Sequence, residues 1–280
     1  MSAASTEVRP LTVGVQTLGC RLNQYESDGI IQKFVESGRY TACAPGEGPD
    51  IAIVNTCTVT DQADSRNRNA IKQALKKNPR ARVFVTGCFA QTDPEKLREM
   101  PGVAMVIGND RKSALYEIVE EYLAGETPEL PESRYHPESA ALGGAYGERP
   151  IMEQPFAYGD VIPFGHTRAY MKIQDGCDRR CTYCKIPMAR GRGVSRPAED
   201  ILEHVRRLEG EGVPEIVLTG VNLGWYRDRS MDNLRFAPLL ERILETLTHA
   251  RLRLSSIEPC DVDAELGRLS LHSRFCDFLH

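Results

Sequence analysis

The chain has 280 residues, of which 41% are hydrophobic and 26% charged, so it can form two domains that each bury a core. This ordinary globular composition excludes collagen-like, low-complexity and intrinsically disordered classes, and the formal net charge of −4 argues against a uniformly basic nucleic-acid coat. The N-terminus lacks the basic and apolar sections of a signal peptide, and no apolar run approaches the ~20 residues that cross a bilayer. These features predict a cytoplasmic protein with no membrane partner.

In the first half, short apolar runs alternate with helical patterns, as they do in a parallel α/β sheet. The spacing of Ile30, Ile31 and Phe34 along one face predicts a helix over Glu26–Glu36. The other expected elements are the strands Leu11–Leu18, Ile51–Asn55, Arg82–Thr86 and Val103–Ile107 and the helices Arg66–Lys77, Pro94–Met100 and Ser113–Leu123. We therefore predict an open parallel-sheet α/β domain over residues 1–124.

Periodicity disappears between residues 125 and 165, where Pro, Gly and Ser recur in a stretch too long for an ordinary loop, so we predict an interdomain linker. The alternation resumes over residues 166–280. The expected elements there are the strands Tyr170–Gln174, Glu215–Thr219 and Arg253–Ile257 and the helices Ala198–Leu208, Pro238–Leu247 and Ala264–Leu269. A further apolar run begins at Phe275. Three to four βα units cannot close a barrel, so we expect a partial (β/α) barrel that is truncated at its C-terminus.

The nine cysteines are an odd number in an apparently cytosolic protein, where grouped thiols bind metal or do chemistry more often than they form disulfides. Cys177, Cys181 and Cys184 form a CxxxCxxC loop directly after a predicted strand. Such a loop brings three thiolates onto one small centre, as iron–sulfur clusters and some zinc sites require. A structural zinc site would need a fourth ligand such as His166, and the paired CxxC typical of those sites is missing.

A second set of cysteines is dispersed along the first half. Cys20, Cys57 and Cys88 each follow the end of a predicted strand, at spacings of 37 and 31 residues. Because the carboxyl ends of adjacent parallel strands meet at one edge of a sheet, these spacings predict three thiolates side by side. The alternative is that they pack as small buried residues, which is also our interpretation of Cys43, Cys260 and Cys276.

The compact loop resembles the CxxxCxΦC signature of the radical S-adenosylmethionine superfamily, with Tyr183 at the aromatic position Φ. The resemblance implies a 4Fe-4S cluster on the three cysteines, with one iron open to S-adenosylmethionine, and places Tyr183 near the adenine of that cofactor. It also implies that Thr219, Gly220 and Asn222 lie near the methionine end of the cofactor. The reduced cluster of that superfamily cleaves the cofactor to a deoxyadenosyl radical.

The segments around Cys20, Cys57 and Cys88 resemble the N-terminal domain of the methylthiotransferases within that superfamily. The matching stretches are Gly-Cys20-Arg-Leu-Asn-Gln-Tyr-Glu-Ser, Asn-Thr-Cys57-Thr-Val-Thr and Thr-Gly-Cys88-Phe-Ala-Gln. Pro187, Arg190-Gly191 and Ser195-Arg196 match the segment after the radical motif. The resemblance implies that the dispersed cysteines hold a second, auxiliary 4Fe-4S cluster that carries the sulfur to be inserted.

Within the family, the chain is most similar to the MtaB-type branch, partly through the stretch from Ser255 to Pro259. This implies methylthio insertion at C2 of N6-threonylcarbamoyladenosine beside the tRNA anticodon, with electrons from a donor such as flavodoxin or ferredoxin. Two alternatives stay open within the family, namely isopentenyladenosine in tRNA and a ribosomal protein aspartate. A third, of another class, is a truncated metal-binding fragment without catalysis.

Basic residues gather beside the compact loop. Residues 168–196 carry eight basic side chains against two aspartates, a local excess of six positive charges. Charge alone favours a solvated loop, whereas the interleaved cysteines favour a functional segment. A solvated face is likewise our interpretation of the basic helix that carries Arg66, Arg68, Lys72, Lys76 and Lys77. Trp225 and Tyr226 are expected to be core or rim residues, with base stacking as the alternative.

Overall fold

The computed structural model describes residues 9–58, 61–126, 152, 154–179 and 181–277. The first half is built on a five-stranded parallel sheet in the order β2-β1-β3-β4-β5. Its strands are β1 (Leu11–Thr17), β2 (Tyr40–Ala42), β3 (Ile51–Thr56), β4 (Arg82–Gly87) and β5 (Val103–Val106). Strands β3 and β4 are apolar on both sides, as expected for central strands of a sheet covered by helices on both faces.

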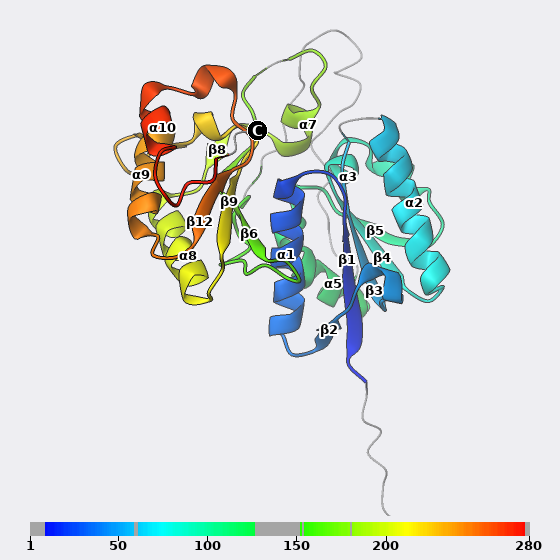
Figure 1. Cartoon of the computed structure of the whole chain (residues 1–280). Helices are drawn as coiled ribbons and strands as arrows, with labels where there is room; N and C mark the ends of the chain where they lie inside the picture. Colours follow the sequence, from blue (N-terminus) through cyan, green and yellow to red (C-terminus); the bar gives the residue numbers. More distant parts are fainter. Residues whose placement is uncertain (1–8, 59–60, 127–151, 153, 180, 278–280) are drawn as a thin grey trace, which may run out of the picture.

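Five α-helices cover this sheet (Figure 1). They are α1 (Arg21–Glu36), α2 (Asp61–Lys77), α3 (Cys88–Thr92), α4 (Pro94–Arg98) and α5 (Leu115–Leu123). Successive residues of a strand point to opposite faces, so Ile51 and Ile53 pack in the core with α1 and α5. Ala52 and Val54 pack in the core with α2, α3 and α4. Two short 3-10 turns, Pro45–Glu47 and Lys112–Ala114, complete this half.

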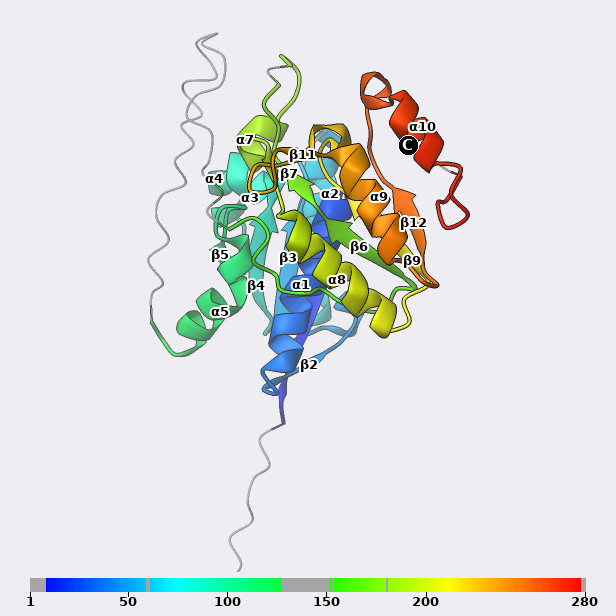
Figure 2. The same cartoon turned by 90° about the vertical axis from the view of Figure 1, so that its left-hand side faces the viewer.

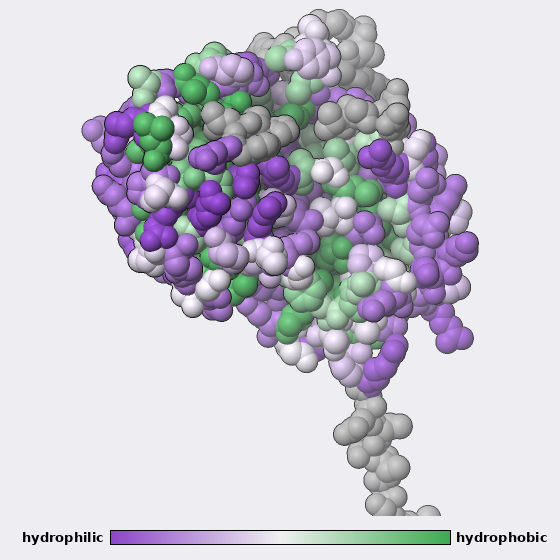
Figure 3. Space-filling model, in the orientation of Figure 1, coloured by the Kyte–Doolittle hydropathy of each residue, from purple (hydrophilic) through white to green (hydrophobic). Residues whose placement is uncertain are grey.

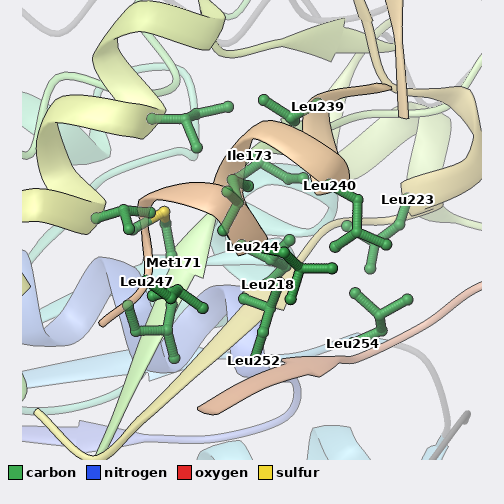
Figure 4. Packing of buried hydrophobic residues seen from close by; sticks show 14 of the residues in the cluster. Met171, Ile173, Leu218, Leu223, Leu239, Leu240, Leu244, Leu247, Leu252 and Leu254 are labelled. Atoms are coloured by element: carbon green, nitrogen blue, oxygen red, sulfur yellow. The ribbon is translucent and has the colours of Figure 1, made fainter. Parts of the chain in front are cut away.

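The second half is built on a three-stranded parallel sheet in the order β12-β9-β6. Its strands are β6 (Arg168–Lys172), β9 (Glu215–Thr219) and β12 (Arg251–Leu254). Helices α8 (Ala198–Gly210) and α9 (Phe236–Thr246) cover one face, and α10 (Ala264–Leu269) packs beside α9 (Figure 2). Leucines dominate this core, where Leu218 and Leu252 lie among the side chains of α9 (Figure 4).

Several short elements line the carboxyl edge of this second sheet. They are β7 (Gln174–Asp175), α7 (Ile186–Arg190), β8 (Val194–Ser195), β10 (Arg227–Asp228) and β11 (Leu234–Arg235), with 3-10 turns at Leu223–Trp225 and Pro259–Asp261. Phe275 pairs in parallel with Leu252, so the apolar run that begins there continues the sheet beyond β12.

The two halves pack directly on each other. Helix α1 lies between the first sheet and strand β6 of the second (Figure 1). Residues 154–162 of the predicted linker run over α1, and Tyr158 and Val161 are buried in the first core. The Gln32 carboxamide oxygen accepts a hydrogen bond from the backbone amide of Ile162 at 2.9 Å. Residues 127–151 and 153 lie outside the described part.

The predicted α/β class, an open parallel sheet followed by part of a (β/α) barrel, is confirmed. Many of the predicted boundaries shift by one to three residues, and helix α2 begins at Asp61 rather than Arg66. Two further differences have a clear structural reason. Helix α1 begins at Arg21 rather than Glu26, because its first turns bury polar residues and so lack an apolar periodicity. Strand β12 ends at Leu254, because the chain then turns so that the carbonyl oxygen of Ser256 accepts from the amide of Leu223. No helix in the described ranges is long and apolar enough to cross a membrane.

Candidate functional site

The three dispersed cysteines follow strand ends that are in register. Thr17 of β1 pairs with Asn55 of β3, and Thr56 of β3 pairs with Gly87 of β4. Cys20, Cys57 and Cys88 therefore leave the sheet at one edge, as the sequence predicts. Cys20 is exposed, whereas Cys57 and Cys88 are buried.

The backbone before Cys20 touches Cys57. Gly19 has φ +94°, and a Cβ atom there would lie 2.6 Å from Cys57 Cβ and 2.7 Å from Cys57 Sγ. Only glycine permits both this left-handed conformation and this approach. The Gly-Cys pair is thus part of the geometry that brings the first two cysteines together.

Buried asparagines fix the loops that carry these cysteines. Asn23 Nδ2 donates to the carbonyl oxygens of Leu18 at 2.7 Å and Thr56 at 2.9 Å, which flank Cys20 and Cys57. The side chain of Asn67 bonds both the amide and the carbonyl of Cys57. Sequence reasoning gave these asparagines no separate role, because a single amide side chain carries no periodic signal.

The compact loop is held by its own backbone. Gly176 has φ +67°, and a Cβ atom there would lie 1.9 Å from the carbonyl oxygen of Arg192, so the turn into the loop requires glycine. The amide of Cys177 donates to Gly191 O at 3.1 Å, and the amide of Cys184 donates to Cys181 O at 3.0 Å. All three cysteines are partly exposed. Burial raises the pKa of the Cys177 thiol, and the neighbouring Cys184 and Cys181 raise it further.

The two cysteine sites are neighbours across the junction of the halves. Helix α7, which follows the compact loop, packs on α3, whose first residue is Cys88 (Figure 2). Asn109 joins them, because its Nδ2 atom lies 3.5 Å from Cys88 Sγ and donates to the Ala189 carbonyl oxygen of α7 at 2.8 Å. The dispersed site and the helix that follows the compact loop therefore meet at the junction of the two halves.

The donor set suits iron–sulfur clusters, since thiolates hold these clusters in proteins and each site gathers three cysteines. Over the ranges that the structure describes, no three His, Cys, Asp or Glu side chains stand in a closed metal-binding arrangement. A 4Fe-4S cluster is larger than a single ion, so its cysteine ligands stand further apart than those of a mononuclear metal site. The glycine-lined approach of the Cys20 loop to Cys57 and the partly exposed compact loop are the features that fit such a group.

A buried cluster of charged residues lies beside both sites, and we call it the junction cluster. Its members are Glu26, Lys112, Lys172, Asp175 and Arg190. Glu26 accepts from Lys112 and Lys172 at 2.7 Å and from Arg190 at 2.9 Å. Asp175 accepts from Lys172 at 2.9 Å and from Arg190 at 3.0 Å. Although burial opposes it, the surrounding cations hold the pKa values of both carboxyl groups below their usual range.

The residues expected to bind cofactor are partly brought together. Thr219 ends strand β9 and Gly220 follows it, where a Cβ atom would lie 3.1 Å from the side chain of Gln174, just before the compact loop. Asn222 donates its backbone amide to Gln174 Oε1 at 2.9 Å, while its side chain donates to Asp261 at 2.9 Å. Tyr183 stands apart from these contacts with 88% of its surface exposed.

A polar cavity of about 900 Å³ opens beside the compact loop. Gln174, Asp178 and Trp225 are among its lining residues. Four exposed arginines also line it, namely Arg192, Arg227, Arg229 and Arg235. Within the described part of the chain, none of the four forms an ion pair with a carboxylate. Asp178, Asp228 and Asp261 also line the cavity, so its four arginines leave an excess of one positive charge. Guanidinium groups bind carboxylates and phosphates well.

Two further expectations can be judged directly. Tyr226 is 1% exposed and donates its hydroxyl to Arg196 O at 2.8 Å, so it is a core residue and cannot stack on a base. Trp225 is half-buried, with the Arg179 guanidinium 4.8 Å from its ring centroid. The basic residues of α2 are exposed, on an edge of the molecule rich in hydrophilic side chains (Figure 3).

Comparison with known proteins gives two family matches in series. Residues 12–108 match the family described as "Uncharacterized protein family UPF0004", and residues 171–261 match the radical SAM superfamily. Solved structures of TsrM from Kitasatospora setae, described as a radical S-adenosylmethionine methyltransferase, have a TM-score of 0.58 at 17% identity. They match over 95% of this chain and 58% of theirs, a likeness of fold.

The curated relatives that the chain matches are tRNA-modifying enzymes of two related kinds. The threonylcarbamoyladenosine tRNA methylthiotransferase MtaB of Aquifex aeolicus is 36% identical over 92% of this chain and 59% of its own length. MtaB of Bacillus subtilis is 36% identical over 91% of this chain and 53% of its own. The tRNA-2-methylthio-N(6)-dimethylallyladenosine synthase of Rhodopirellula baltica is 30% identical over 91% of this chain and 53% of its own. The chain thus spans little more than half the length of these relatives.

The serial arrangement of a UPF0004 region and a radical SAM region, each with three cysteines at the carboxyl edge of a parallel sheet, defines a radical S-adenosylmethionine protein with a second cysteine site. The chain therefore joins a UPF0004 region to a radical SAM region, and over nine tenths of its length it is similar to methylthiotransferases of the MtaB type.

Proposed function

We propose that this chain provides the cysteine-bearing part of a tRNA methylthiotransferase. The reaction is insertion of a methylthio group at C2 of N6-threonylcarbamoyladenosine, next to the anticodon. The observation that carries the proposal is the meeting of two three-cysteine sites at one junction, joined by Asn109 between Cys88 and Ala189. A sulfur donor and a radical generator must face the same substrate carbon, and this arrangement supplies two neighbouring sites.

In this proposal each site binds a 4Fe-4S cluster, Cys177, Cys181 and Cys184 holding one and Cys20, Cys57 and Cys88 the other. When bound, the first cluster and S-adenosylmethionine supply a radical able to attack an unactivated C–H bond. The protein positions these groups, with Tyr183, Thr219, Gly220 and Asn222 placed around the cofactor. No acid–base pair is needed for that chemistry, which agrees with the cysteine-dominated site.

The arginine-lined cavity supports the threonylcarbamoyladenosine branch over the dimethylallyladenosine branch. The threonyl group carries a carboxylate, whereas the dimethylallyl group is an apolar hydrocarbon. The guanidinium groups beside the compact loop can bind the threonyl carboxylate. Covering them with the dimethylallyl group would bury charge against hydrocarbon, which is unfavourable. These groups belong to Arg192, Arg227, Arg229 and Arg235. An unpaired anticodon loop is a suitable substrate, because its bases can leave the stack and enter a pocket.

The test is mass spectrometry of tRNA nucleosides from cells that lack the gene, complemented with the wild-type gene or with variants. Cys57→Ala and Cys181→Ala should each abolish 2-methylthio-N6-threonylcarbamoyladenosine. Cys43→Ala, at a partly buried cysteine outside both sites, is the matched control and should restore it. An unchanged profile in the deletion strain would overturn the tRNA assignment, and loss of the dimethylallyl product instead would assign the sister branch.

A second measurement addresses the alternative of a non-catalytic metal-binding fragment. The chain reconstituted anaerobically with iron and sulfide should bind about eight irons if both sites take 4Fe-4S clusters. With a strong reductant or an electron donor such as flavodoxin or ferredoxin, it should form 5′-deoxyadenosine from S-adenosylmethionine. Iron bound without deoxyadenosine would favour the fragment.

A further inference from the structure

The junction cluster contains more positive than negative charge. Lys112, Lys172 and Arg190 face only two carboxylates, Glu26 and Asp175, and each of the five side chains is at most 3% exposed. Nearby Tyr25 and Tyr158 supply no anion, because burial raises the pKa of both phenols. All three cations contact a carboxylate, but the cluster carries an excess of one positive charge in a buried environment, where unbalanced charge is unfavourable.

Direct contacts lead from this cluster to the dispersed cysteines. Arg190 Nη2 donates to Asn23 Oδ1 at 2.6 Å. Asn23 in turn donates to the carbonyl oxygens of Leu18 and Thr56, which lie just before Cys20 and Cys57 in the chain. The residue before Arg190, Ala189, accepts from the amide group of Asn109 that also lies against Cys88 Sγ. Arg190 is therefore linked through Asn23 to the backbone before Cys20 and Cys57, and its neighbour Ala189 is linked through Asn109 to Cys88.

The cysteines are also the remaining acidic groups that act on the cluster. Burial opposes the charge of both cations and lowers the pKa of Lys112, and Cys88 partly offsets this. The pKa of Arg190 is raised despite burial, by Asp175 and Glu26 and then by Cys88 and Cys20. Together with the contacts through Asn23, these influences place the excess charge beside the dispersed site.

We propose that the excess positive charge of the junction cluster is the built-in counter-charge of the iron–sulfur group held by Cys20, Cys57 and Cys88, with Arg190 as the positioning residue. The inference rests on the proposed function, since it assumes that these cysteines bind a cluster. Three thiolates give such a group a net negative charge, and net charge is one of the factors that sets its reduction potential. A cation buried beside it favours the reduced state.

The experiment uses the full chain with Cys177→Ala, Cys181→Ala and Cys184→Ala, so that only the dispersed site binds a cluster. The midpoint potential of that cluster is measured by a redox titration followed by electron paramagnetic resonance. Arg190→Gln removes the excess charge and should shift the potential to more negative values. Asp175→Asn increases the excess and should shift it to more positive values, and the double variant should return close to the parent.

Two controls separate charge from fold. Arg80→Gln removes an exposed cation at the turn before β4 and should leave the potential unchanged. Arg190→Lys keeps the positive charge but loses the two-pronged guanidinium contacts. Its midpoint potential should therefore stay close to that of the parent. Its iron should be retained roughly tenfold more weakly, as happens when residues next to metal ligands are changed. If Arg190→Gln does not fold, Asp175→Asn and the double variant still give one shifted and one restored value.

The outcomes distinguish the two levels of the argument. Failure of the parent with intact Cys20, Cys57 and Cys88 to bind iron would overturn both the proposed auxiliary site and this inference. A bound cluster whose potential ignores the sign of the charge change would overturn the inference alone and would reduce the junction cluster to a clamp between the two halves.

Discussion

The two cysteine sites are built in opposite ways. The dispersed site takes one cysteine from the end of each of three neighbouring strands, so its geometry exists only when the first sheet is folded. The compact site takes all three from eight consecutive residues and is fixed by one glycine turn and two backbone hydrogen bonds. Two of the dispersed thiols are buried, whereas the compact ones are all partly exposed.

This difference separates what is set by tertiary structure from what is set by local sequence. A buried site made by a sheet is preorganised and shielded, which suits a group that must persist. An exposed loop beside an open cavity suits a centre that must admit a cofactor. The two sites should therefore respond differently to the same kind of perturbation, and the following measurements test that expectation.

The largest effect should come from removing each set of cysteines. Replacement of Cys20, Cys57 and Cys88 by alanine should remove about four of about eight irons, and replacement of the compact set should remove the other four. Iron and sulfide analysis after anaerobic reconstitution checks both values. Loss of all iron from either triple variant would show that the sites are not independent.

Substitution of one glycine should affect iron binding at the compact loop without affecting the dispersed site. Gly176→Ala places a Cβ atom 1.9 Å from Arg192 O, so the loop must shift and its iron should be lost while that of the dispersed site remains. Gly212→Ala is the matched control, because Gly212 has a similar φ of +73° with nothing within 4 Å and should cost only about 1–2 kcal/mol of backbone strain. Equal iron loss in the two variants would contradict this picture.

The stability of the apo fold should depend on pH through His204, away from both cysteine sites. Burial and the nearby Arg196 lower the pKa of His204 to about 4. The imidazole is thus neutral when folded, with Nε2 donating to Val161 O at 2.9 Å. Between pH 6.5 and about 4 only the unfolded chain binds this proton, so stability falls as the pH is lowered through that window, by up to about 3 kcal/mol.

Denaturant unfolding of the apo protein at a series of pH values measures this dependence. His204→Gln keeps a donor near Val161 and removes the titration, so its stability should vary less across the same window. An identical slope for the variant and the wild type would assign the dependence to other groups.

The smallest effects should come from a pair of tyrosines. Tyr183 is 88% exposed and Tyr226 is 1% exposed. Tyr183→Ala should leave thermal unfolding unchanged and weaken S-adenosylmethionine binding about fivefold, as loss of about 1 kcal/mol of stacking would. Tyr226→Phe should show the reverse, with about 1 kcal/mol less stability from the lost bond to Arg196 O and unchanged binding. Calorimetric binding and thermal melts of both variants decide the matter.

The strands were predictable because alternating or continuous apolar runs are local properties of the sequence. The convergence of Cys20, Cys57 and Cys88 on one edge followed from the strand order and needed no further information. The very short elements, such as α3 and α7, were not predicted, since five residues cannot establish a helical period. Their places are fixed by packing against each other across the junction.

The junction cluster shows most clearly what the sequence conceals. Glu26 meets Lys112, Lys172 and Arg190 over separations of 86 to 164 residues, and no local pattern reports such pairings. The basic excess of residues 168–196 was interpreted as a solvated loop or as part of a functional segment. Lys172 and Arg190 are instead buried, so part of that charge is internal to the protein.

Residues 154–162 connect the two halves and so affect how the molecule unfolds. Tyr158 and Val161 insert into the core of the first half, while the carbonyl of Val161 binds His204 on α8 of the second. Separation of the two halves would expose Tyr158 and Val161 from the core of the first half and would break the hydrogen bond between Val161 and His204 of the second. Melting of the two halves should consequently be concerted, a single cooperative transition rather than two.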